Sequence, residues 1–197
     1  MTAVSELLIY LLISAFLQNV IFTRTLGVSR IHLNLGSPRK ILTFGGCLTL
    51  VAFLSSFLGF LVSWLFRENG WPAQARPICF LVCISLVYIG LVFGLKYAKN
   101  IQTERMKVML IDSSFNCAVL GAMLISASQM HSLARTVGFS IGTGIGFTLA
   151  TLLIYTGRRR LALSDVPRAF RGLPIGFLYI GLISLSIYGL IGHQLAS

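Results

Sequence analysis

The chain has 197 residues, of which 56% are hydrophobic and only 11% are charged, and its mean hydropathy is +0.86. A soluble domain carries about 25% charged residues, so a soluble fold of this length would have too few charges to cover its surface. The composition therefore indicates an integral membrane protein. The net charge of +11 does not indicate nucleic-acid binding, because the basic residues cluster in short loops and no basic stripe carries interleaved aromatic residues.

Six apolar segments follow one another along the chain, each of the roughly 20 residues that a helix needs to cross a bilayer. They are Val4–Phe22, Ile41–Phe66, Pro77–Leu95, Val108–Ser128, Thr136–Thr156 and Leu173–Gly192. The first contains Glu6 and lacks a basic flank, so we expect a retained helix rather than a cleaved signal peptide. The sequence predicts an all-α integral membrane protein of six transmembrane helices in one membrane domain, residues 1–197.

The basic residues predict the orientation of these helices. Three fall in the second and fourth loops, namely Arg67, Arg76 and Arg135. The other thirteen fall in the first, third and fifth loops: Arg24, Arg30, Arg39, Lys40, Lys96, Lys99, Arg105, Lys107, Arg158, Arg159, Arg160, Arg168 and Arg171. Because positive loops are retained in the cytoplasm, we expect the odd loops inside and both termini outside.

Six spans divide into two three-helix halves, residues 1–98 and 99–197. Since three is odd, the second half enters the membrane from the opposite side, as in inverted-repeat transporters. The first span of each half carries a polar interruption, Gln18-Asn19 before Leu26-Gly27 and Phe115-Asn116 before Leu120-Gly121. Such interruptions are typical of broken helices at the membrane midplane. Chance similarity of short strings is the alternative.

Cys117 is the first candidate site residue. At a 1.5 Å rise per residue it lies roughly 15 Å beyond Lys107, near the middle of the hydrocarbon core. Polar residues at that depth are functional candidates, although a buried cysteine also packs as a small apolar side chain. Asp112 is the acidic residue deepest in a span. It fits either an ion path or pairing with Lys107 or Arg105 near the interface.

The remaining cysteines, Cys47, Cys79 and Cys83, all lie in apolar segments. We expect them to pack, without forming disulfides. In the fifth span the glycines from Gly138 to Gly146 are expected to allow close helix approach rather than to bind phosphate.

Several strings of the chain resemble the A subunit of the Rnf electron-transport complex and the homologous E subunit of the sodium-translocating NADH:quinone reductase. They are Asn116–Gly121, Gly138–Thr148, Arg159–Ala162, Asp165–Pro167, Phe170–Gly172 and Gln18-Asn19 to Leu26-Gly27. The resemblance covers most of the chain. It implies a six-helix inverted repeat in a bacterial plasma (inner) membrane, paired with a homologous six-helix subunit of opposite topology and surrounded by lipid.

The resemblance also implies a [2Fe–2S] cluster near the membrane midplane, to which each subunit of the pair supplies two cysteines. That cluster would carry electrons across the bilayer and couple NADH, ferredoxin or quinone chemistry to Na⁺ or H⁺ transport. Cys117 matches one family ligand. The family's first motif has a cysteine shortly after Leu-Gly, and here Ser29 occupies that position. Thiolates are the usual ligands of such clusters.

Two other functions fit six spans and basic cytoplasmic loops. One is a substrate-binding membrane subunit of a vitamin importer, which would bind its ligand without metal. The other is a divergent paralogue of the Rnf subunit that keeps the scaffold and has lost the cluster.

Overall fold

The computed structural model describes residues 3–28, 36–97, 103–129, 132–163, 165 and 167–191. Over these residues the secondary structure is helical and contains no strand, which confirms the all-α prediction. The helices are α1 (Ala3–Leu12), η1 (Ile13–Leu17), α3 (Pro38–Glu68), η2 (Ala73–Ala75), α4 (Arg76–Tyr97), α5 (Thr103–Ser114), α6 (Cys117–Gln129), α7 (Leu133–Ala162), η3 (Arg168–Phe170) and α8 (Leu173–Ile191). The proposed boundary between the halves, at residues 98 and 99, lies outside the described residues.

Three of the predicted spans are continuous helices, long and apolar enough to cross a membrane: Pro38–Glu68, Ala73–Tyr97 and Leu133–Leu161. The fourth is bent by 43° between Met106–Ser114 and Cys117–Gln129. The first and last correspond to the shorter apolar helices Ala3–Leu17 and Leu173–Gly189. The described structure is therefore that of a membrane protein, and it departs from six continuous helices mainly where polar residues interrupt the first and fourth segments.

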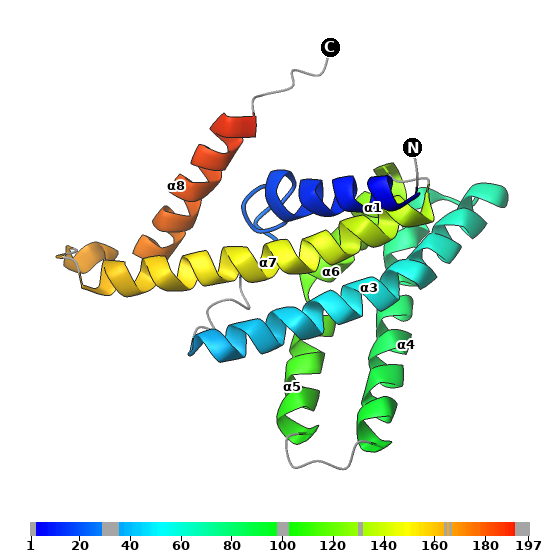
Figure 1. Cartoon of the computed structure of the whole chain (residues 1–197), viewed down its shortest axis with the longest axis horizontal. Helices are drawn as coiled ribbons and strands as arrows, with labels where there is room; N and C mark the ends of the chain where they lie inside the picture. The colour runs from blue at the N-terminus through cyan, green and yellow to red at the C-terminus, as the bar shows by residue number, and fades with distance from the viewer. Residues whose placement is uncertain are drawn as a thin grey trace.

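The two longest helices, α3 and α7, lie side by side in the centre of the molecule and run in opposite directions (Figure 1). Gly45 of α3 lies against the side chain of Thr148, and Gly144 of α7 lies against Thr49. A Cβ atom at either glycine would collide with the facing threonine. Because small residues let helices approach closely in lipid, this reciprocal pair of glycines sets the separation of α3 and α7.

The first helix, α1 with η1, lies along α7 (Figure 1). Glycines one turn apart on α7 lie against backbone carbonyls of α1 and η1: Gly138 against Leu7, Gly142 against Leu11 and Gly146 against Ala15. The expectation that these glycines serve packing is confirmed. Ser14 adds polar contacts, since its hydroxyl donates to the carbonyl of Phe139 and lies 2.8 Å from Oγ1 of Thr143.

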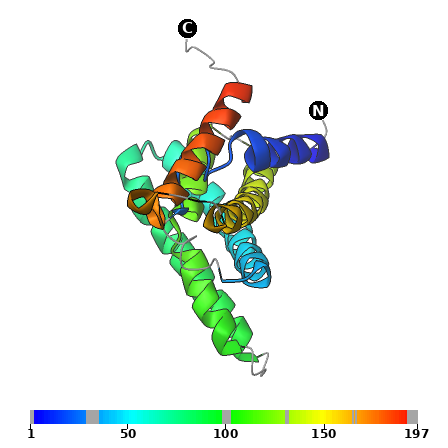
Figure 2. The same ribbon diagram turned by 90° about the vertical axis from the view of Figure 1, so that its left-hand side faces the viewer.

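The other helices extend away from this centre. In Figure 1, α4 and α5 run together at a steep angle to α3 and α7, and α8 diverges from the end of α7. Figure 2 shows the same divergence of α8 after a turn of 90°. Large apolar side chains on α8 are exposed, among them Phe177, Leu182 and Leu185. Such surfaces are covered by lipid or by another protein chain in a membrane.

Candidate functional site

The first helix ends at an asparagine with three side-chain hydrogen bonds. After Leu17 the chain enters the turns of residues 18–27, and Asn19 is buried near their start. Its Nδ2 donates to the carbonyls of Ala15, at 3.0 Å, and of Gly146 on α7, at 2.8 Å. Its Oδ1 accepts from the amide of Ile21 at 3.0 Å. Asn19 thus ties the end of the first helix to α7 and organises the turns that follow.

A second asparagine lies at the break between α5 and α6. Oδ1 of Asn116 accepts from the amide of Ala118 at 3.0 Å, which is the usual bond of a residue that caps a helix N-terminus. The Nδ2 atom of Asn116 is buried and has no hydrogen-bond partner. In both breaks an asparagine side chain accepts from the amide two residues further on, so the two polar interruptions have similar local structures.

The two breaks meet through Gly27 and Cys117, which are 90 residues apart in the sequence. The amide of Gly27 donates to Sγ of Cys117 at 2.9 Å. Gly27 has a φ of +83°, and a Cβ there would lie 2.6 Å from Cε2 of Phe147 and 2.9 Å from Oδ1 of Asn116. Both the backbone conformation and the close packing require glycine.

Cys117 is the first residue of α6, and its side chain is exposed on the surface of the chain. The other cysteines differ: Cys83 is buried in the core, and Cys47 and Cys79 are half-buried. All four thiols are free, as the sequence predicted. Of the four, Cys117 is the thiol most open to a ligand or to a second protein chain.

Cys117 is a single thiol and does not by itself make a complete metal site. Within the described residues no group of three or more His, Cys, Asp or Glu side chains is placed to hold a metal ion. Ser29, which the family resemblance aligns with a cysteine, lies outside the described residues. A [2Fe–2S] cluster takes four ligands, of which the thiol of Cys117 supplies at most one. Hydrogen bonds to sulfur, such as that from Gly27, are among the interactions that tune these clusters.

Asp112 lies on α5, two residues before that helix ends at Ser114, and it is half-buried. The break between α5 and α6 therefore separates Asp112 from the helix that begins at Cys117. Its part in an ion path stays a prediction.

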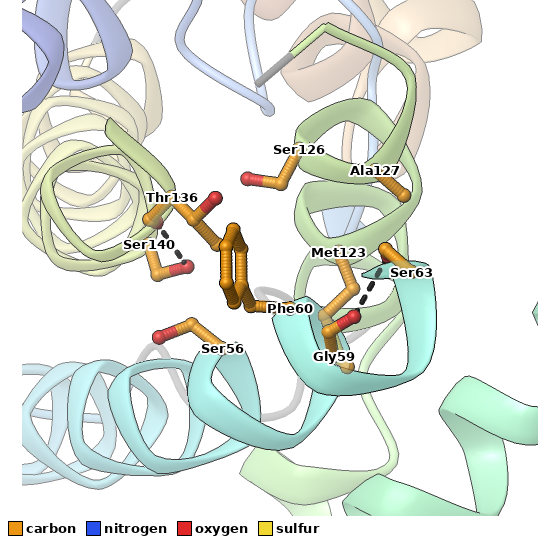
Figure 3. Close-up of a pocket in the computed structure, with 9 residues that line it drawn as sticks. All are labelled: Ser56, Gly59, Phe60, Ser63, Met123, Ser126, Ala127, Thr136 and Ser140. Carbon is orange, nitrogen blue, oxygen red and sulfur yellow. Dashed lines mark hydrogen bonds between the residues drawn. The ribbon is translucent and has the colours of Figure 1, made fainter. Parts of the chain in front are cut away.

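A cavity of about 10 Å³ between α3, α6 and α7 was not predicted from the sequence (Figure 3). Hydroxyl groups line it, from Ser56, Ser63, Ser126, Thr136 and Ser140. The signal in the sequence was the spacing of these residues: Ser56 and Ser63 are seven apart on α3, and Thr136 and Ser140 are four apart on α7, so each pair shares a helix face.

The chain is similar in sequence to membrane subunits of known redox complexes. The profile of the family described as "Rnf-Nqr subunit, membrane protein" matches residues 7–193. The A subunit of the Na⁺-translocating ferredoxin:NAD⁺ oxidoreductase complex of Acetobacterium woodii is 30% identical over 95% of this chain and 98% of that protein. The A subunit of the ion-translocating oxidoreductase complex is 30% identical in Azoarcus sp., over 95% of this chain and 97% of that protein. Its counterpart in Aromatoleum aromaticum is 31% identical over the same shares. The chain therefore belongs to the Rnf-Nqr family of membrane subunits.

Proposed function

We propose that this chain is a membrane subunit of an Rnf-like, ion-translocating redox complex and helps to carry electrons across the bilayer. The names of its relatives support this function, since they describe subunits of ion-translocating oxidoreductase complexes, one of them Na⁺-translocating. The structural observation that carries it is the exposed thiol of Cys117 at a helix break, with the amide of the other break directed at its sulfur. The names of the family and the relatives give no support to the importer alternative.

Cys117 would be this chain's ligand to a [2Fe–2S] cluster shared with a partner. When bound, such a cluster accepts and releases single electrons. The described residues of this chain would position the sulfur: Asn116 caps α6 and so places Cys117 in its first turn, and Gly27 donates to Sγ. Ser29 stands where the family has its second cysteine, so its hydroxyl oxygen, a harder donor than sulfur, is the candidate second ligand.

We further propose that the chain consists of two inverted three-helix halves with both termini outside. The starts of α1 and α7 lie together, because Arg135 binds both carboxylate oxygens of Glu6, at 3.0 and 3.2 Å. The start of α3, with Arg39 and Lys40, lies near the opposite end, as does the end of α7 with Arg158–Arg160 (Figure 1). The two basic helix ends therefore lie on the same side, which supports their position in the cytoplasm.

The partner that best fits the exposed thiol is a homologous six-helix subunit of opposite topology. It would supply the ligands that the described residues of this chain lack, and the exposed apolar face of α8 provides further surface for contact with other chains or lipid. We place the assembly in the bacterial plasma membrane.

Purification of the tagged chain from its native membranes tests this function. We expect it to bring down flavin-, ferredoxin- and six-helix-type subunits, together with iron and acid-labile sulfide. Assembly without any iron at this site would support the paralogue that has lost its cluster. A chain purified without partners or iron, and with a bound vitamin, would contradict the proposal.

A further inference from the structure

An apolar groove lies between the first half of α3 and the helices α4 and α5, which leave α3 at a steep angle (Figure 1). Its volume is about 290 Å³, close to the lower end of the volumes of small-molecule sites. Leu91 and Leu95 of α4 and Met106 of α5 line it and are half-buried, and Leu110 of α5 is buried. The groove is therefore large enough for a section of a hydrocarbon chain.

The side of the groove that α3 contributes is a single helix face. Thr43, Gly46, Cys47 and Leu50 line it and are three or four residues apart, so they lie above one another on the helix. Nothing lies within 4 Å of a Cβ position at Gly46. The hydroxyl of Thr43 donates to the carbonyl of Arg39 at 2.9 Å and does not need a partner in the groove. The lining thus fits hydrocarbon better than a polar solute.

The same face of α3 becomes positively charged at the end of the groove. Arg39 precedes Thr43 by four residues and Gly46 by seven, and Lys40 precedes Cys47 by seven, so both basic residues continue the groove face. Their side chains are exposed, and the first turn of α3 contains no acidic residue. Because the N-terminus of a helix is itself partly positive, this end of the groove favours an anion.

Neighbouring residues on α5 do not neutralise this charge. Asp112 follows the lining residue Leu110 by two positions, and residues two apart do not share a helix face. Lys107 directly follows the lining residue Met106 and adds a further basic residue to this part of the chain. None of the described residues that line the groove is acidic. The site therefore combines an apolar groove with a positive end.

We propose that this groove binds one anionic phospholipid, with an acyl chain along the groove and the phosphate group at Arg39 and Lys40. Such a lipid matches both features, whereas a soluble anion would leave the apolar lining uncovered and a neutral lipid would leave the two cations without a net countercharge. Basic pockets between membrane helices are typical sites for anionic headgroups, and arginine binds phosphate oxygens with two parallel hydrogen bonds.

The proposed orientation places this end of α3 in the cytoplasm, and the cytoplasmic leaflet is the one rich in anionic lipid. The lipid site does not depend on the cluster, because none of its lining residues belongs to the helix breaks around Gly27 and Cys117. It goes beyond the proposed function by giving the chain a specific lipid ligand.

Photocrosslinking of the purified complex tests the site. The probe is a phosphatidylglycerol with a diazirine in one acyl chain, and mass spectrometry locates its adducts on the chain. We expect adducts on the groove residues of α3 and α4. Unlabelled phosphatidylglycerol should displace the probe about thirtyfold better than phosphatidylcholine, since each of two basic residues contributes about fivefold near the membrane surface.

Two variants separate the headgroup contact from the acyl-chain contact. The double variant Arg39→Gln, Lys40→Gln should lose the preference for phosphatidylglycerol and keep the adducts at high probe concentration. Gly46→Leu places a side chain in the groove, where nothing opposes it, and should reduce the adducts by about tenfold or more at an unchanged melting temperature.

Each variant has a matched control. Arg159→Gln with Arg160→Gln removes the same charge from the end of α7, at exposed residues on the same side of the molecule that do not line the groove. Gly90→Leu adds the same side chain at an exposed glycine of α4 that has open space around it and does not line the groove. We expect both controls to be labelled like the wild type and with the same lipid preference.

The proposal is overturned if the wild-type complex gives no adducts in the groove, as it would with a partner protein seated there, or if both lipids displace the probe equally well. Loss of the lipid preference in the α7 control to the same extent would also overturn it, because the effect would then reflect overall charge. Failure of the proposed function would look different, since a complex without iron would still show the groove adducts and their dependence on Arg39 and Lys40.

Discussion

The amide of Gly27 and the sulfur of Cys117 are joined by a hydrogen bond of 2.9 Å between two parts of the chain that are 90 residues apart. Cys117 directly follows Asn116, and Gly27 lies eight residues after Asn19, the asparagine at the other helix break. The contact therefore brings the polar interruptions of the first and fourth apolar segments to one place, at the only exposed cysteine among the described residues.

Gly27→Ala is expected to destabilise the protein by about 2 kcal/mol or more, because it combines a strained positive φ with overpacking against Phe147. Gly172→Ala is the matched control, since Gly172 has a φ of +91° and open space around the position of a Cβ. It should cost about 1 kcal/mol. Thermal unfolding in nanodiscs measures both. Equal melting temperatures of the two variants would contradict the close packing at Gly27.

Asn19→Ala should destabilise the fold more than Asn116→Ala, by about 1 kcal/mol. Asn19 makes three side-chain hydrogen bonds, one of them to Gly146 of α7, and Asn116 makes one, within its own turn. Chemical unfolding of the two variants in matched detergent gives the comparison. A larger loss of stability in Asn116→Ala would mean that the helix cap at Asn116 stabilises the fold more than the hydrogen bond of Asn19 to α7.

Gly45→Leu is predicted to separate α3 from α7, at a cost of about 3 kcal/mol, because the new side chain would occupy the position of Thr148. Gly46→Leu, one residue further on, should be tolerated, since nothing lies within 4 Å of its Cβ position. The fraction of monodisperse protein after detergent extraction and its melting temperature distinguish the two. Similar behaviour of both variants would be inconsistent with the reciprocal glycine packing.

Arg135→Lys should lower the melting temperature slightly, because lysine cannot reproduce the two-pronged contact with Glu6 or the stacking of Arg135 on Tyr10 at 5.4 Å. In a protein that already carries Glu6→Gln, Arg135→Lys should lower the melting temperature little further, since the interaction between the two side chains is already lost. Arg67→Lys at the end of α3 serves as the control. Additive effects of the Arg135 and Glu6 changes would show that the two side chains act separately.

Composition and hydropathy were sufficient to predict a helical membrane protein, because a chain with so few charges has no other stable environment. The same reasoning placed the polar interruptions correctly at Gln18-Asn19 and Phe115-Asn116. It did not predict how the chain breaks there: the π-helical turn of η1 and the 43° bend before α6 depend on hydrogen bonds to α7 and on capping by Asn116. The lengths of the first and last apolar segments in the sequence could not reveal that the helices within them end earlier, at Leu17 and Gly189.

The position of Cys117 on α6 was predictable, and its contact with Gly27 was not, because that contact depends on how two distant breaks pack. The hydroxyl-lined cavity was missed for a related reason. Each of its residues looks like an ordinary small residue on its own helix, and only the packing of α3, α6 and α7 brings Ser56, Ser126 and Ser140 around one space. The resemblance to Rnf subunits, in contrast, was confirmed by the family profile over residues 7–193.

The measurement that tests the central proposal most directly is the iron content and electron paramagnetic resonance spectrum of the purified complex carrying Cys117→Ala. We predict that it loses one [2Fe–2S] signal and about two iron atoms per complex, while Cys79→Ala, at a half-buried cysteine on α4, retains both. An unchanged spectrum and iron content in an assembled Cys117→Ala complex would contradict the assignment of Cys117 as a cluster ligand.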